Sequence, residues 1–154
     1  MPPESQVHRQ VVRKALDDRE VRIDPIVNLY FLEVREPDMH DPSGDFQRLI
    51  EALQNQWGFD NKNEITADLS VHQKLQDALR KGQWKITIAL RSGNRVIGIW
   101  PGLKEQVFGA AVDVGSTTIS VHLVNLHSGR TISSSGGMNP QIRFGEDLMS
   151  RVSY

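Results

Sequence analysis

The chain has 154 residues and a formal net charge of −1, with acidic and basic residues interspersed. It has no apolar run long enough to span a bilayer and no basic footprint for nucleic acid, so neither a membrane nor a nucleic acid is an expected partner. The absence of cysteine excludes a disulfide or a cysteine-bound iron–sulfur cluster within these residues. The first residues lack the basic-then-apolar order of a secretory signal, and the expected location is cytoplasmic.

The first quarter of the chain predicts a linker and then a strand. Residues 1–25 are polar and charged and are interpreted as a linker or extension, in which a weak helix with Val7 and Val11 on its apolar side stays open. The apolar, aromatic residues 26–34 predict a buried strand. A helix is expected after Asp41, as N-cap, with Pro42 at its first position and Gly58 at its end. Its apolar stripe consists of Phe46, Leu49, Ile50, Leu53 and Trp57.

A second helix and a hairpin complete this part. Ser70, with Gln73 three residues later, has the pattern of a capping box, and Gly82 is the expected stop. Residues 84–90 alternate in polarity and are expected to pair with residues 95–100 across a Ser-Gly-Asn turn. Strand, helix, helix and hairpin predict an α+β domain over residues 26–102.

From residue 107 the pattern becomes a meander of strands. Residues 107–113, 118–126 and 130–135 are expected as three strands, residues 136–141 as a loop, and residues 146–154 as the beginning of a helix. A three-stranded meander that enters one helix is too little to form a finished domain. Residues 107–154 are therefore expected to be the incomplete, truncated start of a larger domain.

The segment richest in chemistry is Asp113-Val114-Gly115-Ser116-Thr117-Thr118. Gly115 would allow the backbone to approach a polyanion, and the hydroxyls of Ser116, Thr117 and Thr118 would donate to phosphate oxygens. Asp113 would be repelled by phosphate but would hold Mg²⁺. The competing interpretation is an ordinary hairpin turn, which favours the same residue types. No lysine follows the glycine, so this is not the loop of P-loop nucleotidases.

Two runs of residues carry a resemblance to a known family. Residues 108–119 resemble the first phosphate motif of the acetate/sugar kinase, heat-shock protein and actin superfamily. Residues 137–152, with Asn139-Pro140-Gln141, Gly145-Glu146-Asp147 and Ser150-Arg151, resemble the ferredoxin-linked ATPases that reductively activate corrinoid proteins. That resemblance implies a linker over residues 1–25, a middle α+β domain over 26–102, and the start of an actin-like (ribonuclease H-like) α/β ATPase lobe over 107–154.

The resemblance also implies a function. The parent protein would use ATP and Mg²⁺ to drive an electron from an iron–sulfur cluster onto a corrinoid protein whose cobalt is trapped as Co(II). The [2Fe-2S] cluster is expected in an upstream domain absent from this chain. The implied ATP-binding residues are Asp113, Gly115, Ser116, Thr117 and Thr118, of which Asp113 would bind the Mg²⁺. The second phosphate motif and the adenosine motif would lie beyond Tyr154, so the fragment alone is expected to be inactive, with no catalytic residue assigned.

Alternatives remain open at this stage. A sugar or carboxylate kinase of the same superfamily is one, and a non-catalytic module that docks a partner is another. A homodimer also stays open. His122 is a potential base if its strand turns it toward the motif, whereas Glu146 and Asp147 are better explained by the dipole of the helix that they begin. The three tryptophans, Trp57, Trp84 and Trp100, are expected to serve packing rather than a ligand cage.

Overall fold

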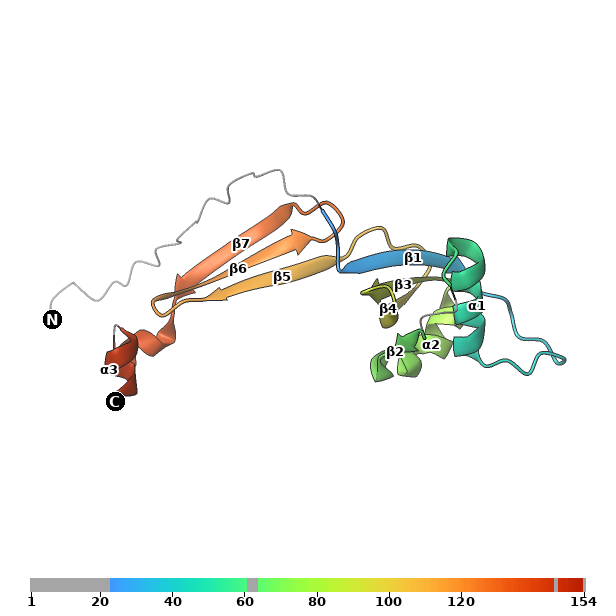
Figure 1. The fold of residues 1–154 in the computed structure, drawn as a ribbon, viewed down its shortest axis with the longest axis horizontal. Helices are drawn as coiled ribbons and strands as arrows, with labels where there is room; N and C mark the ends of the chain where they lie inside the picture. Colours follow the sequence, from blue (N-terminus) through green and yellow to red (C-terminus); the bar gives the residue numbers. More distant parts are fainter. Residues whose placement is uncertain (1–22, 61–63, 146, 154) are drawn as a thin grey trace. The chain divides into compact units, whose positions relative to one another are not determined.

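The computed structural model describes residues 23–60, 64–145 and 147–153. Its contacts divide the chain into two compact units, one formed by Asp24–Val107 and one that contains Phe108–Tyr154. Each unit has its own antiparallel-dominated sheet (Figure 1). The mixed α+β character expected from the sequence is confirmed. No helix in the described ranges is both long enough and apolar enough to cross a membrane.

The first unit is a four-stranded sheet with two helices. Its strands lie in the order β1-β3-β4-β2, in which β1, β3 and β4 are antiparallel neighbours and β2 pairs parallel with β4. In chain order its elements are β1 (Val27–Glu33), α1 (Asp45–Trp57), β2 (Thr66–Ala67), α2 (Leu69–Lys81), β3 (Lys85–Arg91) and β4 (Arg95–Pro101). The strand, two helices and hairpin expected over residues 26–102 are therefore present.

The core of this unit lies between the sheet and the two helices. Leu32 of β1 and Ile86 and Ile88 of β3 are fully buried, and they pack with Leu53 of α1 and Leu79 of α2. These residues occupy the alternating strand positions and the helical stripes read from the sequence, because a half-buried strand repeats every second residue and a helix face every three to four. The sequence periodicity located these core positions, although β3 also buries its other face, where Thr87 and Ala89 are almost fully covered.

Both predicted N-caps were wrong. The N-cap of α1 is Gly44 rather than Asp41, and the N-cap of α2 is Asp68 rather than Ser70, which lies inside the helix. Asp41 instead accepts a hydrogen bond from the backbone N–H of Ser43 and pairs with two arginines. The predicted helix end at Gly58 is confirmed, since this residue has the left-handed φ of 70° that glycine tolerates best.

The outer edge of β1 is closed by side chains from the end of α1. Trp57 Nε1 donates to the carbonyl of Phe31 at 3.0 Å, and the Gln56 carboxamide both accepts from the Glu33 N–H at 3.0 Å and donates to the Glu33 carbonyl at 2.7 Å. The Trp57 ring also meets Tyr30 edge to face. Trp57 therefore covers a strand edge, where unpaired backbone groups would otherwise invite another strand.

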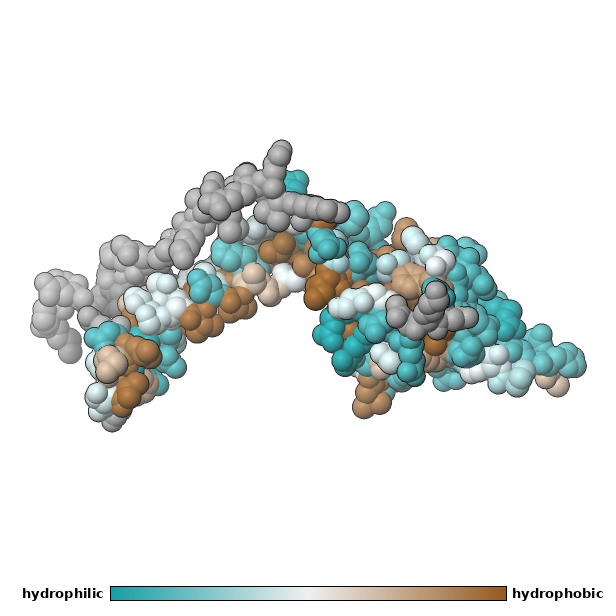
Figure 2. Space-filling model, in the orientation of Figure 1, coloured by the Kyte–Doolittle hydropathy of each residue, from teal (hydrophilic) through white to brown (hydrophobic). Residues whose placement is uncertain are grey.

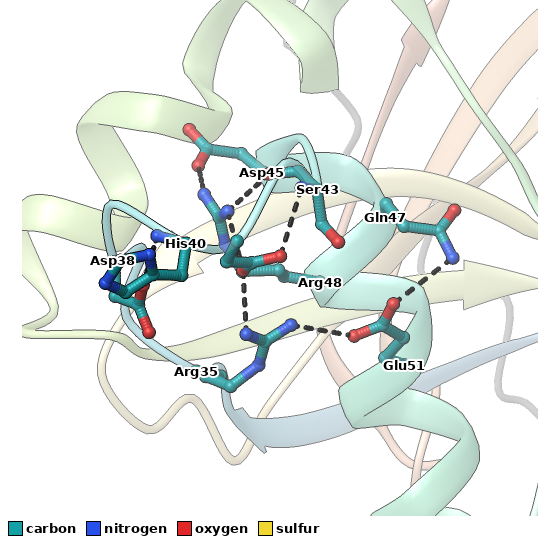
Figure 3. Close-up of polar contacts among 9 residues, drawn as sticks. Arg35, Asp38, His40, Ser43, Asp45, Gln47, Arg48 and Glu51 are labelled. Carbon is teal, nitrogen blue, oxygen red and sulfur yellow. Dashed lines mark hydrogen bonds and ion pairs between the residues drawn. The ribbon is translucent and has the colours of Figure 1, made fainter.

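An ion-pair cluster holds the segment between β1 and α1 (Figure 3). Arg48, whose side chain is only 4% exposed, pairs with Asp41 and with Asp45 and also donates to the Ser43 carbonyl. Arg35 pairs with Asp41 at 2.7 Å and with Glu51 at 3.3 Å. Hydrogen bonds from Ser43, its backbone N–H first, together with the charge of Arg35, lower the pKa of Asp41 from 3.8 to about 2.

This cluster predicts a defined acid sensitivity. A carboxyl group with a depressed folded-state pKa contributes stability that is present above its unfolded pKa and lost as the pH falls through the folded pKa. We therefore expect the urea midpoint of the chain to fall as the pH is lowered from about 4 to about 2, and Asp41→Asn to make that part of the decline shallower. Urea unfolding followed by tryptophan fluorescence measures both. Asp77→Asn, which alters only an exposed pair with Lys81, is the control; a decline as steep in Asp41→Asn as in this control would contradict the prediction.

The second unit is an antiparallel meander in the order β5-β6-β7, followed by two short helices (Figure 1). Its elements are β5 (Phe108–Val114), β6 (Thr118–Asn125), β7 (Thr131–Met138), the 3-10 helix η1 (Pro140–Phe144) and α3 (Leu148–Val152). The predicted third strand was too short, because Gly136 and Gly137 continue it by pairing with Ser120 and Ile119. The terminal helix begins later than predicted, with Asp147 as its N-cap. Glu146 and residues 1–22 lie outside the described residues.

The apolar side chains of this unit stay at the surface. The buried apolar residues of the described chain all lie between Val27 and Ile99, in the first unit. The hydrophobic surface of β5–β7 and α3 is visible as brown patches in Figure 2. The exposed apolar residues there are Phe108, Val112, Val114, Val121, Leu123, Ile132, Met138, Phe144, Leu148, Met149 and Val152. The meander is therefore held together by its ladder hydrogen bonds more than by a core.

Candidate functional site

The sequence motif forms the turn between β5 and β6, residues 115–117, together with the strand ends on either side. Asp113 is the penultimate residue of β5 and lies opposite Ser120 of β6. At the turn, Gly115 N–H donates to the Thr118 carbonyl at 2.9 Å. A Cβ atom at Gly115 would stand 2.8 Å from that same oxygen, which is closer than real Cβ contacts. Glycine is thus required here by the hairpin's own backbone.

Asn139, directly after β7, joins the turn to the segment that follows. Its side chain is buried, and its Nδ2 donates to the Gly115 carbonyl at 2.9 Å. Its backbone N–H donates to the Thr117 carbonyl at 2.8 Å. Its Oδ1 accepts from the Gln141 N–H at 3.0 Å and so caps η1. One asparagine therefore holds both ends of the turn and the start of the next helix.

Arg151 of α3 holds the middle of the same turn. Its guanidinium donates to the Ser116 carbonyl at 2.5 Å and, through Nε, to the Gly145 carbonyl at 2.8 Å. The helix that carries it begins with a capping box in which Asp147 and Ser150 bond reciprocally. The hydrogen bond from the Ser150 backbone N–H, with the Ser150 side chain, lowers the pKa of Asp147. The capping box keeps α3, and with it Arg151, in place beside the turn.

His122 lies on the same face of the sheet as Asp113, two positions beyond Ser120 along β6. Its Nδ1 is 2.8 Å from the Oγ of Ser134 on β7. The alternation therefore puts Asp113, Ser120, His122 and Ser134 on one polar face, and Val112, Val114 and Val121 on the other. This settles the face that the sequence left open, and it places the imidazole beside a serine hydroxyl.

The fit of the expected cofactors differs. Mg²⁺ needs only one or two carboxylates when water and phosphate supply the other ligands, so Asp113 suits it. No group of three or more His, Cys, Asp or Glu residues in the described ranges is placed to hold a metal by itself. A [2Fe-2S] cluster does not fit this chain at all, because its thiolate ligands would have to come from cysteine and the sequence has none.

Sequence reasoning missed how Asn139 and Arg151 act. Both residues belong to the run 137–152 that carries the family resemblance. The resemblance marked them as typical of the family but did not indicate what they contact. Their bonds to the turn join residues 24 and 35 positions apart. Only the three-dimensional structure brings these partners together.

Comparison with protein families now identifies the chain. Residues 16–106, more than half of it, match the family model described as the RACo linker region. The chain belongs to the RACo family. Residues 108–154 match the RACo middle region. In RACo terms, the residues expected as a middle domain fall in the linker region, and those expected as the start of an ATPase lobe fall in the middle region.

Two relatives extend the comparison. The corrinoid activation enzyme RamQ of Eubacterium limosum is 30% identical over 91 residues, which are 58% of this chain and 15% of RamQ. The solved structure of a reductive activator for corrinoid, iron-sulfur protein is 30% identical with a TM-score of 0.66, over 88% of this chain and 22% of that one. The resemblance to reductive activators of corrinoid proteins is confirmed. The chain spans less than a quarter of the length of either relative.

Proposed function

We propose that the RACo-family protein containing this chain reductively activates a corrinoid protein and uses ATP to do so. The observation that carries the proposal is the match of 88% of the chain, at a TM-score of 0.66 and 30% identity, to a reductive activator for corrinoid, iron-sulfur protein. The similarity to RamQ, which is named as a corrinoid activation enzyme, supports the same role. The corrinoid protein is thus the proposed partner.

The ATP part of the proposal rests on the second unit. Residues 107–154 are proposed to begin an actin-like ATPase lobe. The phosphates of ATP would bind at Gly115, Ser116, Thr117 and Thr118, and the Mg²⁺ that accompanies them at Asp113. Support comes from a hairpin that presents a carboxylate and, two positions later, a glycine followed by three hydroxyl residues. Hydroxyl and backbone N–H groups donate to phosphate, and a carboxylate one turn away holds the cation that neutralises it.

The electron itself is proposed to come from another part of the protein. This chain has no cysteine, so a [2Fe-2S] cluster would be bound outside it. Reduction of Co(II) to Co(I) takes one electron, and the cluster supplies it when bound. The residues described here would bind and orient the phosphates of ATP, whose hydrolysis would make the unfavourable electron transfer proceed.

The test uses the full-length protein with its cluster assembled, a corrinoid protein in the Co(II) state and a chemical reductant. We expect the Co(II) absorbance to disappear when ATP and Mg²⁺ are both present, and to persist with a non-hydrolysable ATP analogue. Equal rates with and without ATP would remove ATP from the proposal. Phosphorylation of a sugar or carboxylate with no change in the corrinoid would favour the kinase alternative.

A further inference from the structure

We propose that Asn139 and Arg151 are positioning residues that hold the β5–β6 turn by its carbonyl oxygens, so that its N–H groups face a bound phosphate. This inference rests on the proposed binding of ATP at the turn. It adds two residues, from a different part of the sequence, to those that the motif itself contains.

Three consecutive carbonyl oxygens of the turn are engaged by these two residues. The Gly115 oxygen accepts from Asn139 Nδ2 at 2.9 Å, and the Thr117 oxygen accepts from the Asn139 backbone N–H at 2.8 Å. Between them, the Ser116 oxygen accepts from the Arg151 guanidinium at 2.5 Å. Two of these bonds come from side chains and one from a backbone N–H, and all three donors lie after β7 in the sequence.

Peptide geometry then fixes the direction of the N–H groups. In a trans peptide the C=O of one residue and the N–H of the next point to opposite sides, and no described peptide bond is cis. The N–H groups of Ser116, Thr117 and Thr118 therefore point away from the groups that bind the carbonyls preceding them. Within the described chain the N–H groups of Ser116 and Thr117 have no backbone acceptor. Successive N–H groups presented in this way form an anion-binding concavity.

The side-chain types suit this role. Asn139 is 4% exposed, and its carboxamide must donate to Gly115 while it accepts from Gln141. Aspartate could accept from Gln141 but could not donate to Gly115, so it would set two oxygens against each other. Arg151 bridges two carbonyls that lie on different segments through two nitrogens, Nε and Nη2, held in one plane, whereas lysine offers a single nitrogen on a flexible chain.

The chain offers a matched control for Asn139. Asn125 lies at the end of β6 that is far from the turn and is similarly buried, at 9% exposure. The hydrogen bonds of its side chain in the described chain are made by Oδ1, which accepts from the N–H groups of His127 at 2.9 Å and Ser128 at 3.1 Å. Asn125→Asp therefore keeps its hydrogen bonds, whereas Asn139→Asp loses its donor. Arg151→Lys keeps the positive charge and loses one of the two contacts, which separates positioning from charge.

The experiment measures ATP and adenosine affinity of the full-length protein by calorimetry for the parent, Asn139→Asp, Arg151→Lys and Asn125→Asp. We expect Asn139→Asp and Arg151→Lys to weaken Mg·ATP binding by about tenfold while adenosine, which has no phosphate, binds as in the parent, and Asn125→Asp to change neither. If the parent binds ATP and both variants bind it equally well, the positioning role is overturned and the proposed function stands. Equal losses for ATP and adenosine would also overturn it, because they would report a general structural effect. A parent that does not bind ATP would overturn the proposed function along with it.

Discussion

Asp113→Asn in the full-length protein is expected to lower the steady-state ATPase rate by about a hundredfold or more at saturating Mg²⁺. The amide has nearly the shape of the carboxylate, so the hairpin should keep its fold. It is a far weaker ligand for a hard cation, and the loss of one metal-positioning carboxylate removes several kcal/mol of transition-state stabilisation. Cluster-dependent reduction of an artificial acceptor, which needs no ATP, should continue at the parent rate.

Ser133→Ala is the control for this variant. Ser133 is exposed on β7, where it pairs with Leu123 rather than with the residues of the turn. It is expected to leave turnover near the parent value. Asparagine serves hairpin turns as well as aspartate does, so near-normal turnover in Asp113→Asn would mean that Asp113 only shapes the turn. That result would remove Asp113 from the proposed metal site.

Hydrogen exchange of the 154-residue chain is expected to differ sharply between its two units. Amides of β3 should exchange about a hundredfold or more slowly than amides of β6, because opening β3 must expose a packed core. Ile86, Ile88 and Leu90 of β3 are fully buried, whereas Val121 and Leu123 of β6 are 37% and 40% exposed. Mass spectrometry of peptides that cover residues 85–91 and 118–125 measures the ratio.

Similar protection in both peptides would contradict this expectation. It would show that the apolar face of the meander, which carries Val112, Val114 and Val121, is covered in solution. A second copy of the chain packed against that face of the sheet would have this effect. Size-exclusion chromatography with light scattering on the same sample distinguishes a dimer from a monomer.

The elements of the first unit could be predicted because their signals are local. The stripe of α1, its end at Gly58 and the alternation in β3 each depend on residues within a few positions of one another. The first residues of the helices were harder to predict, because a residue suited to an N-cap can instead pair with a residue outside the helix. Asp41 pairs with Arg35 and Arg48, and Asp68 bonds Arg95 at 2.5 Å. Charged pairs between distant segments overrode the local pattern.

The candidate site also has one part that local sequence predicts and one part that it does not. Asp113 and the turn after it are contiguous, so the sequence by itself determined which groups stand together there and showed that glycine and hydroxyls follow a carboxylate. It also determined the family, through runs of residues that can be read without a structure. Only the tertiary structure decided which way the turn faces. We infer that this direction is set by Asn139 and Arg151, whose bonds to the turn's carbonyls come from residues after β7, the strand that pairs with β6. A peptide plane can rotate freely in the unfolded chain, and it acquires a direction when a distant donor binds its oxygen.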